Sequence, residues 1–514
     1  MGAEVNAKSF TREQRTRYRE RLMVNLETFA RYLGSGQFDP VRRIGLEIEL
    51  NLANPDFSPA LRNTEVLEAI ADPAFQTEIG AFNIEFNHDA VQIEGRGLLD
   101  LEESLRRELD QAVARAQDVD VNILLVGILP TLNQDVLHSK NWMSPGKRYA
   151  ALNTSVLQAR GEDVLIDIVG QERLSFYVAN IAPEAACTSV QLHLQVSPEE
   201  FAPAWNAAQV IAAPQVALAA NSPMFMERVL WHESRIEVFK QSIDTRPPEM
   251  RNQGVRPRVW FGEKWITSIL DLFEENVRYF PALLPELSRK RAETTSSGAP
   301  TLPELRLHNG TVYRWNRPIF DPGKDLPNLR IENRLLPAGP TVVDTVANAA
   351  FFFGLMRALR TADRPLWSRM SFQTATDNFL ECARHGLEAH VYWPGLGEIP
   401  VTELIIRHLL PLTAEGLKDL GVDQAIADRY LKILKERAYS EQNGAKWQIE
   451  TLRRLESGST SSGAASLGST SSNAANSGGS KSPGLDRKAA IAEMTRLYNE
   501  NMLSSQPVHT WPLI

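Results

Sequence analysis

Four segments of this chain alternate apolar and polar residues with a period of two, the pattern of a β-strand whose two faces meet different surroundings. The segments cover residues 44–50, 82–87, 190–196 and 329–335. Their apolar residues would face a core, and their polar residues would share the opposite face of a sheet. We therefore predict an antiparallel sheet with one polar face.

Apolar residues at every third or fourth position, the spacing of an amphipathic helix, mark several further segments. Helices are predicted over residues 11–33, 99–116, 203–218, 347–359 and 485–503, and the chain from about residue 363 onward is mostly helical in pattern. Helices together with an antiparallel sheet predict an α+β fold in which the helices flank the sheet.

One segment near the C-terminus differs in composition from the rest of the chain. Residues 456–484 are almost all Ser, Gly, Ala, Thr and Asn, with Leu467 as the one large apolar residue well inside the segment. Such a segment buries too little apolar surface to offset the entropy of ordering it, so we predict a disordered linker. The predicted organisation is an N-terminal helical segment (1–40), a core (41–362), a helical C-terminal region (363–455), the linker (456–484) and a C-terminal helix with a tail (485–514).

The composition excludes several classes of protein. With 514 residues, of which 43% are hydrophobic and 23% charged, the chain can bury a sizeable core. The 55 basic and 63 acidic residues give a formal charge of −8, which argues against a protein whose main partner is nucleic acid. Cys187 and Cys382 are the two cysteines, and the N-terminal residues are polar. We therefore expect a cytoplasmic protein that neither spans a membrane nor depends on disulfides.

The polar face of the predicted sheet carries carboxylates, one histidine and two arginines, and no lysine. These residues are Glu47, Glu49, Glu85, His193, Glu332, Arg330 and Arg334. Any one of the strands could simply show its polar residues to water, but carboxylates gathered on one face repel each other unless a cation neutralises them. Oxygen ligands with one imidazole suit Mg²⁺ or Mn²⁺ better than zinc.

The two arginines flank Glu332 on the same strand face. Arginine and Mg²⁺ together suit the charge of a nucleotide triphosphate. The sequence contains no GxxxxGK[ST] P-loop and no GxGxxG motif after a strand, so the nucleotide would be held by the sheet face itself.

Several motifs occur in a characteristic order over about residues 41–360. They are Gly45-x-Glu47-x-Glu49, the strand 191–196 with His193, Asn221-Ser222-Pro223, Ser234-Arg235, Arg317-Pro318 and Arg330-x-Glu332-x-Arg334. As a set they resemble the bacterial glutamate–cysteine ligase and carboxylate–amine ligase family, which has a glutamine synthetase-like fold. The resemblance implies that the core, 41–362, is a catalytic ligase core.

The resemblance also implies a reaction and the residues that perform it. ATP would phosphorylate a carboxylate, that of glutamate in the best-known case, and an amine would displace the phosphate to form an amide. The implied metal ligands for Mg²⁺ or Mn²⁺ are Glu47, Glu49, His193 and Glu332, followed by Glu85 and Glu94. The implied catalytic residues are Arg334 and Glu332, the implied ATP-phosphate ligands are Arg317, Arg330 and Arg334, and the implied substrate-binding residues are Arg235 and Asn221. Arg148 joins the substrate-binding residues because it lies in a basic, aromatic stretch, 140–153, that could close over the site.

One departure from the family's pattern bears on the metal ligands. The family often has a carboxylate seven residues before the position of Glu94, where this chain has Asn87, with Glu85 two residues further back. Either the loop is longer in this chain or one metal ligand is lost. A metal-dependent hydrolase using the same sheet face and a non-catalytic regulatory protein therefore remain as alternatives to a ligase. The amine could be cysteine, another amino acid or a polyamine.

Cys187 has no partner at the spacing of a catalytic pair, so we expect a structural role for it.

Overall fold

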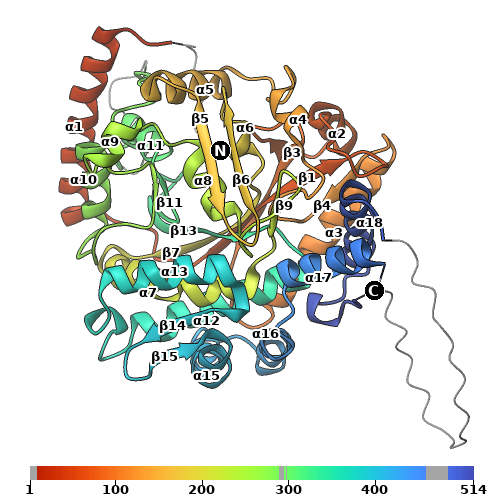
Figure 1. Ribbon diagram of the computed structural model, residues 1–514. Helices are drawn as coiled ribbons and strands as arrows, with labels where there is room; N and C mark the ends of the chain where they lie inside the picture. Colours follow the sequence, from red (N-terminus) through yellow and green to blue (C-terminus); the bar gives the residue numbers. More distant parts are fainter. Residues whose placement is uncertain (1–8, 289–293, 297, 459–483, 514) are drawn as a thin grey trace, which may run out of the picture.

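The computed structural model describes residues 9–288, 294–296, 298–458 and 484–513 (Figure 1). Its main feature is a sheet with the strand order β12-β13-β7-β1-β3-β2, in which β4 pairs with β1 off this path and every pairing is antiparallel. The strands are β1 (Ile44–Ala53), β2 (Phe75–Thr77), β3 (Asn83–Val91), β4 (Asn122–Leu124), β7 (Ser189–Val196), β12 (Asn316–Asp321) and β13 (Asn328–Pro337). The four predicted strands are thus β1, β3, β7 and β13, which are neighbours at the centre of one sheet.

The pairing register aligns the polar residues of neighbouring strands. Glu49 of β1 lies opposite Glu85 of β3, and His193 of β7 lies opposite Glu332 of β13. Paired residues of an antiparallel ladder point to the same face, so these side chains form one continuous polar surface. Gly45 lies opposite His193 on the other side, where a Cβ would come within 3.3 Å of the histidine Cβ. A glycine at this position therefore leaves room for the histidine ring.

The apolar face of the sheet packs on a layer of helices led by α7 (Pro198–Ala219) and α12 (Val342–Arg360). Two buried hydrogen bonds fix α7 against the sheet: Gln215 Nε2 donates to Asn333 Oδ1 at 2.8 Å, and Trp205 Nε1 donates to the Asn316 carbonyl at 2.9 Å. Helix α12 is long and apolar enough to cross a membrane, but 83% of its most apolar stretch is buried inside the protein. It is therefore a core helix, longer than the predicted 347–359.

The chain after residue 362 adds further helices outside this layer, as predicted. They are α13 (Phe372–His385), α14 (Val401–Leu404), α15 (Leu410–Asp419), α16 (Gln424–Ser440) and α17 (Gly444–Ser457). A hairpin of β14 (His390–Trp393) and β15 (Gly397–Pro400) interrupts them, so this region is not wholly helical.

The polar face of the sheet is covered by a second group of elements, which lies on the opposite side from α7 and α12 (Figure 1). These are α5 (Lys147–Arg160), α6 (Ala182–Ala185), α8 (Arg235–Ser242), α10 (Ile269–Tyr279) and α11 (Pro303–Asn309). The remaining described elements are α2 (Asn63–Ile70), α3 (Gly97–Gln117), α4 (Gln134–His138), α9 (Pro248–Asn252) and the short strands β5 (Val164–Val169), β6 (Arg173–Val178), β8 (Met224–Phe225), β9 (Arg228–Val229), β10 (Val259–Trp260) and β11 (Tyr313–Arg314).

Both ends of the described chain pack on the core. Helix α1 (Arg12–Ser35) begins with a capping box between Thr11 and Gln14 and packs against α10 and α11. Helix α18 (Arg487–Leu503) packs against α17, and the tail after it is held because the backbone N–H of Val508 donates to the Asp344 carboxylate. Of the predicted linker, residues 456–457 belong to α17 and are therefore helical, while residues 459–483 lie outside the described residues.

Candidate active site

A cavity of about 1220 Å³ lies on the polar face of the sheet. Its floor is made by side chains of β1, β3, β7, β12 and β13, and its walls by α5, α6, α8 and α11. The cavity contains two groups of three metal-ligand side chains, which we call the histidine triad (Glu47, His193, Glu332) and the carboxylate triad (Glu49, Glu78, Glu85). In each triad the three ligand atoms lie within 4.8 Å of one another.

The histidine triad brings together residues of three adjacent strands. His193 Nε2 lies 3.1 Å from Glu47 Oε1 and 4.0 Å from Glu332 Oε1. The contact with Glu47 is not aligned as a hydrogen bond, and neither ring nitrogen of His193 has a hydrogen-bond partner among the described residues, although both are buried. A buried polar atom without a partner is costly unless something else binds it. An imidazole nitrogen and two carboxylates that converge in this way fit a metal ion.

Two arginines contact the Glu332 carboxylate and keep it in its charged form. Arg317 of β12 forms a bidentate ion pair with Glu332, in which Nη2 lies 2.8 Å from Oε1, and Arg334 Nη1 lies 3.4 Å from the same oxygen. Burial raises the pKa of Glu332, but the two guanidinium charges lower it by more, well below its usual value. Glu332 therefore stays ionised although its side chain is 3% exposed.

The three carboxyl groups of the carboxylate triad lose their protons less readily than ordinary glutamates, because their pKa values are raised. Glu49 accepts hydrogen bonds from the Ser189 backbone N–H at 2.6 Å and from Gln191 Nε2 at 3.0 Å, which orient its carboxyl group. Burial raises the pKa of Glu49 to about 7, and the neighbouring Glu85 adds to this effect. The pKa values of Glu78 and Glu85 are also raised, mainly by burial and by the charges of neighbouring carboxylates. A divalent cation would replace the protons that these groups otherwise retain.

Glu78 was not predicted from the sequence. It follows β2, a strand of three residues, which is too short for a period of two to be recognised. The tertiary structure brings it to the carboxylate triad because β2 pairs with β3, where Gln76 lies opposite Glu85.

Arg334 links the two triads. Its Nη1 donates to Gln191 Oε1 as well as to Glu332, and Gln191 in turn donates to Glu49. Burial lowers the pKa of Arg334, but the carboxylates of Glu332, Glu49 and other neighbours raise it by more, so the guanidinium remains charged. A fixed positive charge therefore lies between two groups of carboxylates.

The comparison with known proteins gives a family for this arrangement. The family model of glutamate–cysteine ligase family 2 matches residues 43–466. The chain belongs to this family. It is thus an ATP-dependent ligase that joins a carboxylate to an amine with a C–N bond. A comparison with curated protein sequences finds no significant match.

Two solved structures of ligases align with most of this chain. A glutamate–cysteine ligase from Francisella tularensis, in complex with AMP, covers 91% of this chain and 90% of its own length, with 11% sequence identity and a TM-score of 0.49. A bifunctional glutathione synthetase from Pasteurella multocida covers 95% of this chain and 55% of its own length, with 11% identity and a TM-score of 0.48.

The structure does not bring Glu94, a predicted metal ligand, to either triad. Glu94 is exposed and does not line the cavity. Strand β3 ends at Val91, and the chain then turns toward α3, where the Gly95 N–H donates to the carbonyl of Gly421. The alternation that places Glu85 on the polar face therefore stops before it reaches Glu94.

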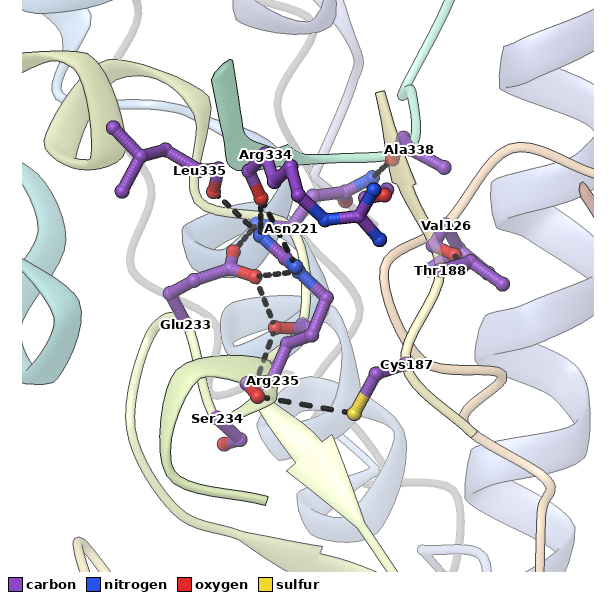
Figure 2. Close-up of polar contacts among 12 residues, drawn as sticks. Val126, Cys187, Thr188, Asn221, Glu233, Ser234, Arg235, Arg334, Leu335 and Ala338 are labelled. Carbon is purple, nitrogen blue, oxygen red and sulfur yellow. Dashed lines mark hydrogen bonds and ion pairs between the residues drawn. The ribbon is translucent and has the colours of Figure 1, made fainter. Parts of the chain in front are cut away.

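Asn221 is also not a cavity residue. It is fully buried, and its Nδ2 lies 2.7 Å from the Ala338 carbonyl (Figure 2). The same Nδ2 lies 2.8 Å from the hydroxyl of Tyr498 in α18. Its backbone N–H donates to Glu233 at 2.9 Å. Asn221 thus joins α7, β13 and α18 and has a structural role.

Arg235 lines the cavity but uses its guanidinium within the protein. Its Nε donates to Glu233 at 3.0 Å, and its two Nη groups contact the backbone carbonyls of Arg334 and Leu335 (Figure 2). It therefore supports the strand that carries Arg334, and these contacts favour a positioning role over the predicted role in binding a substrate carboxylate. The thiol of Cys187 contacts the Arg235 carbonyl at 3.8 Å, and burial raises its pKa well above the usual value, which agrees with the structural role expected for it.

Two other predicted residues also line the cavity. Arg330 points to the edge of the sheet, where Nη1 lies 3.1 Å from Asp321 and 2.8 Å from Asn328 Oδ1. Arg148 is half-buried in α5 at the cavity wall. Helix α5 is fixed over the sheet because the Tyr149 hydroxyl donates to the Thr77 carbonyl at 2.8 Å. Residues 147–153 of the predicted closing segment thus belong to a packed helix, and residues 140–146 form the loop before it.

Proposed function

We propose that this ligase transfers the γ-phosphoryl group of ATP to the γ-carboxylate of glutamate and then joins the resulting acyl phosphate to an amine. The observation that carries the proposal is the convergence of both triads with Arg317 and Arg334 in one cavity. Phosphoryl transfer depends on charge neutralisation and positioning more than on covalent chemistry by the protein, and the charged groups of this cavity would supply both.

The two triads would hold the metal. Glu47, His193 and Glu332 form one donor set, and the carboxylate triad forms the other. Sets dominated by oxygen suit Mg²⁺ or Mn²⁺, which would neutralise the phosphate oxygens of ATP when bound. The convergence of His193 with two carboxylates, without a hydrogen bond to either ring nitrogen, and the raised pKa values of the carboxylate triad support this assignment.

The arginines would divide the remaining work. Arg317 holds Glu332 in its charged form and orients it, so it is a positioning residue. Arg334 lies between the triads and would stabilise the negative charge that develops on the transferred phosphoryl group. Arg330, nearer to the sheet edge, would contact more distant phosphate oxygens.

The walls of the cavity would protect the intermediate. An acyl phosphate hydrolyses when water reaches it, so the enzyme must exclude water during the reaction. Helices α5, α6, α8 and α11 cover the polar face of the sheet and would serve this purpose.

Measurement of ADP release from ATP and Mg²⁺, with L-glutamate and L-cysteine added separately and together, tests the proposal. We expect ADP release to require the carboxylate and to be fastest with both substrates. Glu47→Gln should abolish it, whereas Glu94→Gln, a matched change of an exposed carboxylate outside the cavity, should leave it unchanged. ATP hydrolysis that does not depend on a carboxylate would support the hydrolase alternative. ATP binding without ADP release across a panel of amino acids would support the non-catalytic alternative.

A further inference from the structure

Glu184 is a buried carboxyl group in the cavity wall that the two triads and the arginines leave unexplained. It lies in α6, lines the cavity and is 9% exposed. Its Oε2 is buried and has no hydrogen-bond partner within the described part of the chain. The helix itself is well anchored, because the Ile181 N–H donates to Asn153 Oδ1 at 3.0 Å and the Ala182 N–H donates to Asn180 Oδ1 at 2.9 Å. A firmly held element therefore presents an unsatisfied carboxyl group.

The surroundings of Glu184 connect it to the reacting region. Burial and, to a smaller extent, the charge of Glu49 raise its pKa to about 8, although the charge of Arg334 lowers it. Glu49 of the carboxylate triad and the proposed phosphoryl-binding Arg334 are thus among its electrostatic neighbours. The partnerless carboxyl oxygen at the cavity wall can accept a hydrogen bond from a bound ammonium group.

Aromatic side chains make another part of the cavity wall. Phe239 of α8 contacts Tyr313 edge-on, with ring centroids 5.5 Å apart, and lies 5.8 Å from the ring of Trp315. All three residues line the cavity, and helix α6 packs against α8. The cavity wall therefore offers aromatic surface as well as charged groups such as Arg148 and Arg235.

The reaction needs a group of this kind. An aliphatic amine carries a proton at neutral pH and cannot attack a carbonyl carbon until it loses that proton. In the assignment above, the carboxylates of the two triads bind metal and the arginines have no basic atom available. We propose that Glu184 binds the ammonium group of the amine substrate and accepts its proton. This inference rests on the proposed function.

The step balances as follows. R–NH₃⁺ gives one proton to the Glu184 carboxylate, and the nitrogen lone pair then forms the C–N bond with the acyl carbon. The bond from that carbon to the phosphate oxygen breaks, and the phosphate leaves with the electron pair. The phosphate takes the second nitrogen-bound proton, and Glu184 returns the first proton to solvent after the products leave.

A comparison of two small nucleophiles tests the proposal without knowledge of the natural amine. Hydroxylamine is largely unprotonated near neutral pH and traps an acyl phosphate as a hydroxamate, whereas ammonium must lose a proton before it can form the amide. The full-length protein is given ATP, Mg²⁺ and L-glutamate with either nucleophile at saturation, and both products are measured. In Glu184→Gln we expect the hydroxamate rate to stay within a few-fold of wild type and the amide rate from ammonium to fall about 100-fold or more. Glu184→Asp, which keeps a carboxyl group, should recover part of the amide rate.

The outcomes separate this inference from the proposed function. Wild-type protein that forms neither product refutes the proposed function, and the role of Glu184 with it. Wild-type protein that forms the hydroxamate but no amide refutes the role of Glu184 alone. Equal loss of both products in Glu184→Gln and Glu184→Asp, or no loss of either, also refutes it, because a proton acceptor affects the protonated nucleophile selectively. Melting temperatures of the variants, compared with Glu94→Gln, report whether the fold is retained.

Discussion

Glu49→Gln should remove a pH-dependent loss of stability that the wild-type protein shows when no divalent cation is bound. The pKa of Glu49 is about 7 in the folded protein, mainly because it is buried, against a usual value of 4.5. At pH values between these two pKa values, the Glu49 carboxyl group is protonated in the folded protein and ionised in the unfolded chain. The free energy of unfolding therefore falls as the pH rises through this range.

The size of this change in unfolding free energy follows from the pKa shift of Glu49. Each pKa unit corresponds to about 1.4 kcal/mol, so charging Glu49 costs roughly 3 kcal/mol of stability by about pH 8. Replacement by glutamine also disturbs the hydrogen bonds from Ser189 and Gln191, but that cost does not depend on pH in this range. The difference in unfolding free energy between variant and wild type should therefore shift by roughly 3 kcal/mol in favour of the variant between about pH 5 and about pH 8.

Urea unfolding of both proteins at the two pH values, in EDTA and in millimolar Mg²⁺, measures this shift. In the proposed assignment Mg²⁺ would replace the protons of the carboxylate triad, so its stabilising effect on the wild-type protein should grow with pH and should be smaller in Glu49→Gln. Glu94→Gln is the matched control, since Glu94 is exposed and outside the cavity. If the curves of Glu49→Gln and wild type stay parallel across this pH range in EDTA, the raised pKa of Glu49 is refuted. If Mg²⁺ stabilises both proteins equally, the role of Glu49 as a metal ligand is refuted.

Three further predictions concern single residues. Arg334→Lys keeps the charge but loses the fork of the guanidinium, so kcat should fall about 100-fold with little change in the KM for ATP; an unchanged kcat with a lower melting temperature would show a structural role only. Asn221→Ala removes hydrogen bonds from buried groups that include the Ala338 carbonyl, and should lower the unfolding free energy by about 1–3 kcal/mol in urea titrations, while kcat per folded molecule stays close to wild type. Arg437→Met leaves the buried carboxylate of Asp344 without its ion-pair partner at 2.7 Å and should cost about 3–5 kcal/mol; adding Asp344→Asn should recover part of the loss in thermal unfolding, and no recovery would contradict the unpaired-charge explanation.

The sequence by itself determined the strands and which of their residues share a face. Alternation with a period of two is a local property of the backbone, so Glu47 and Glu49 must point to the same side of β1, as Glu332 and Arg334 must on β13. The residue types on those faces then indicated a polyanion and a cation, and the order of the motifs indicated the family. The strands, the α+β class and the family are confirmed.

Only the tertiary structure decided which polar groups meet in the cavity and which are hydrogen-bonded to other groups inside the protein. Glu78 and Glu184 reach the cavity from a three-residue strand and a four-residue helix, elements too short to leave a periodic signal in the sequence. Glu94 lies outside the cavity because the chain turns away from the sheet after Val91. Asn221 and Arg235 match family motifs, yet their side chains bind groups that come from distant parts of the chain. Hydrogen bonds between residues about 100 or more positions apart depend on how the layers pack, and local patterns of polarity carry no information about that packing.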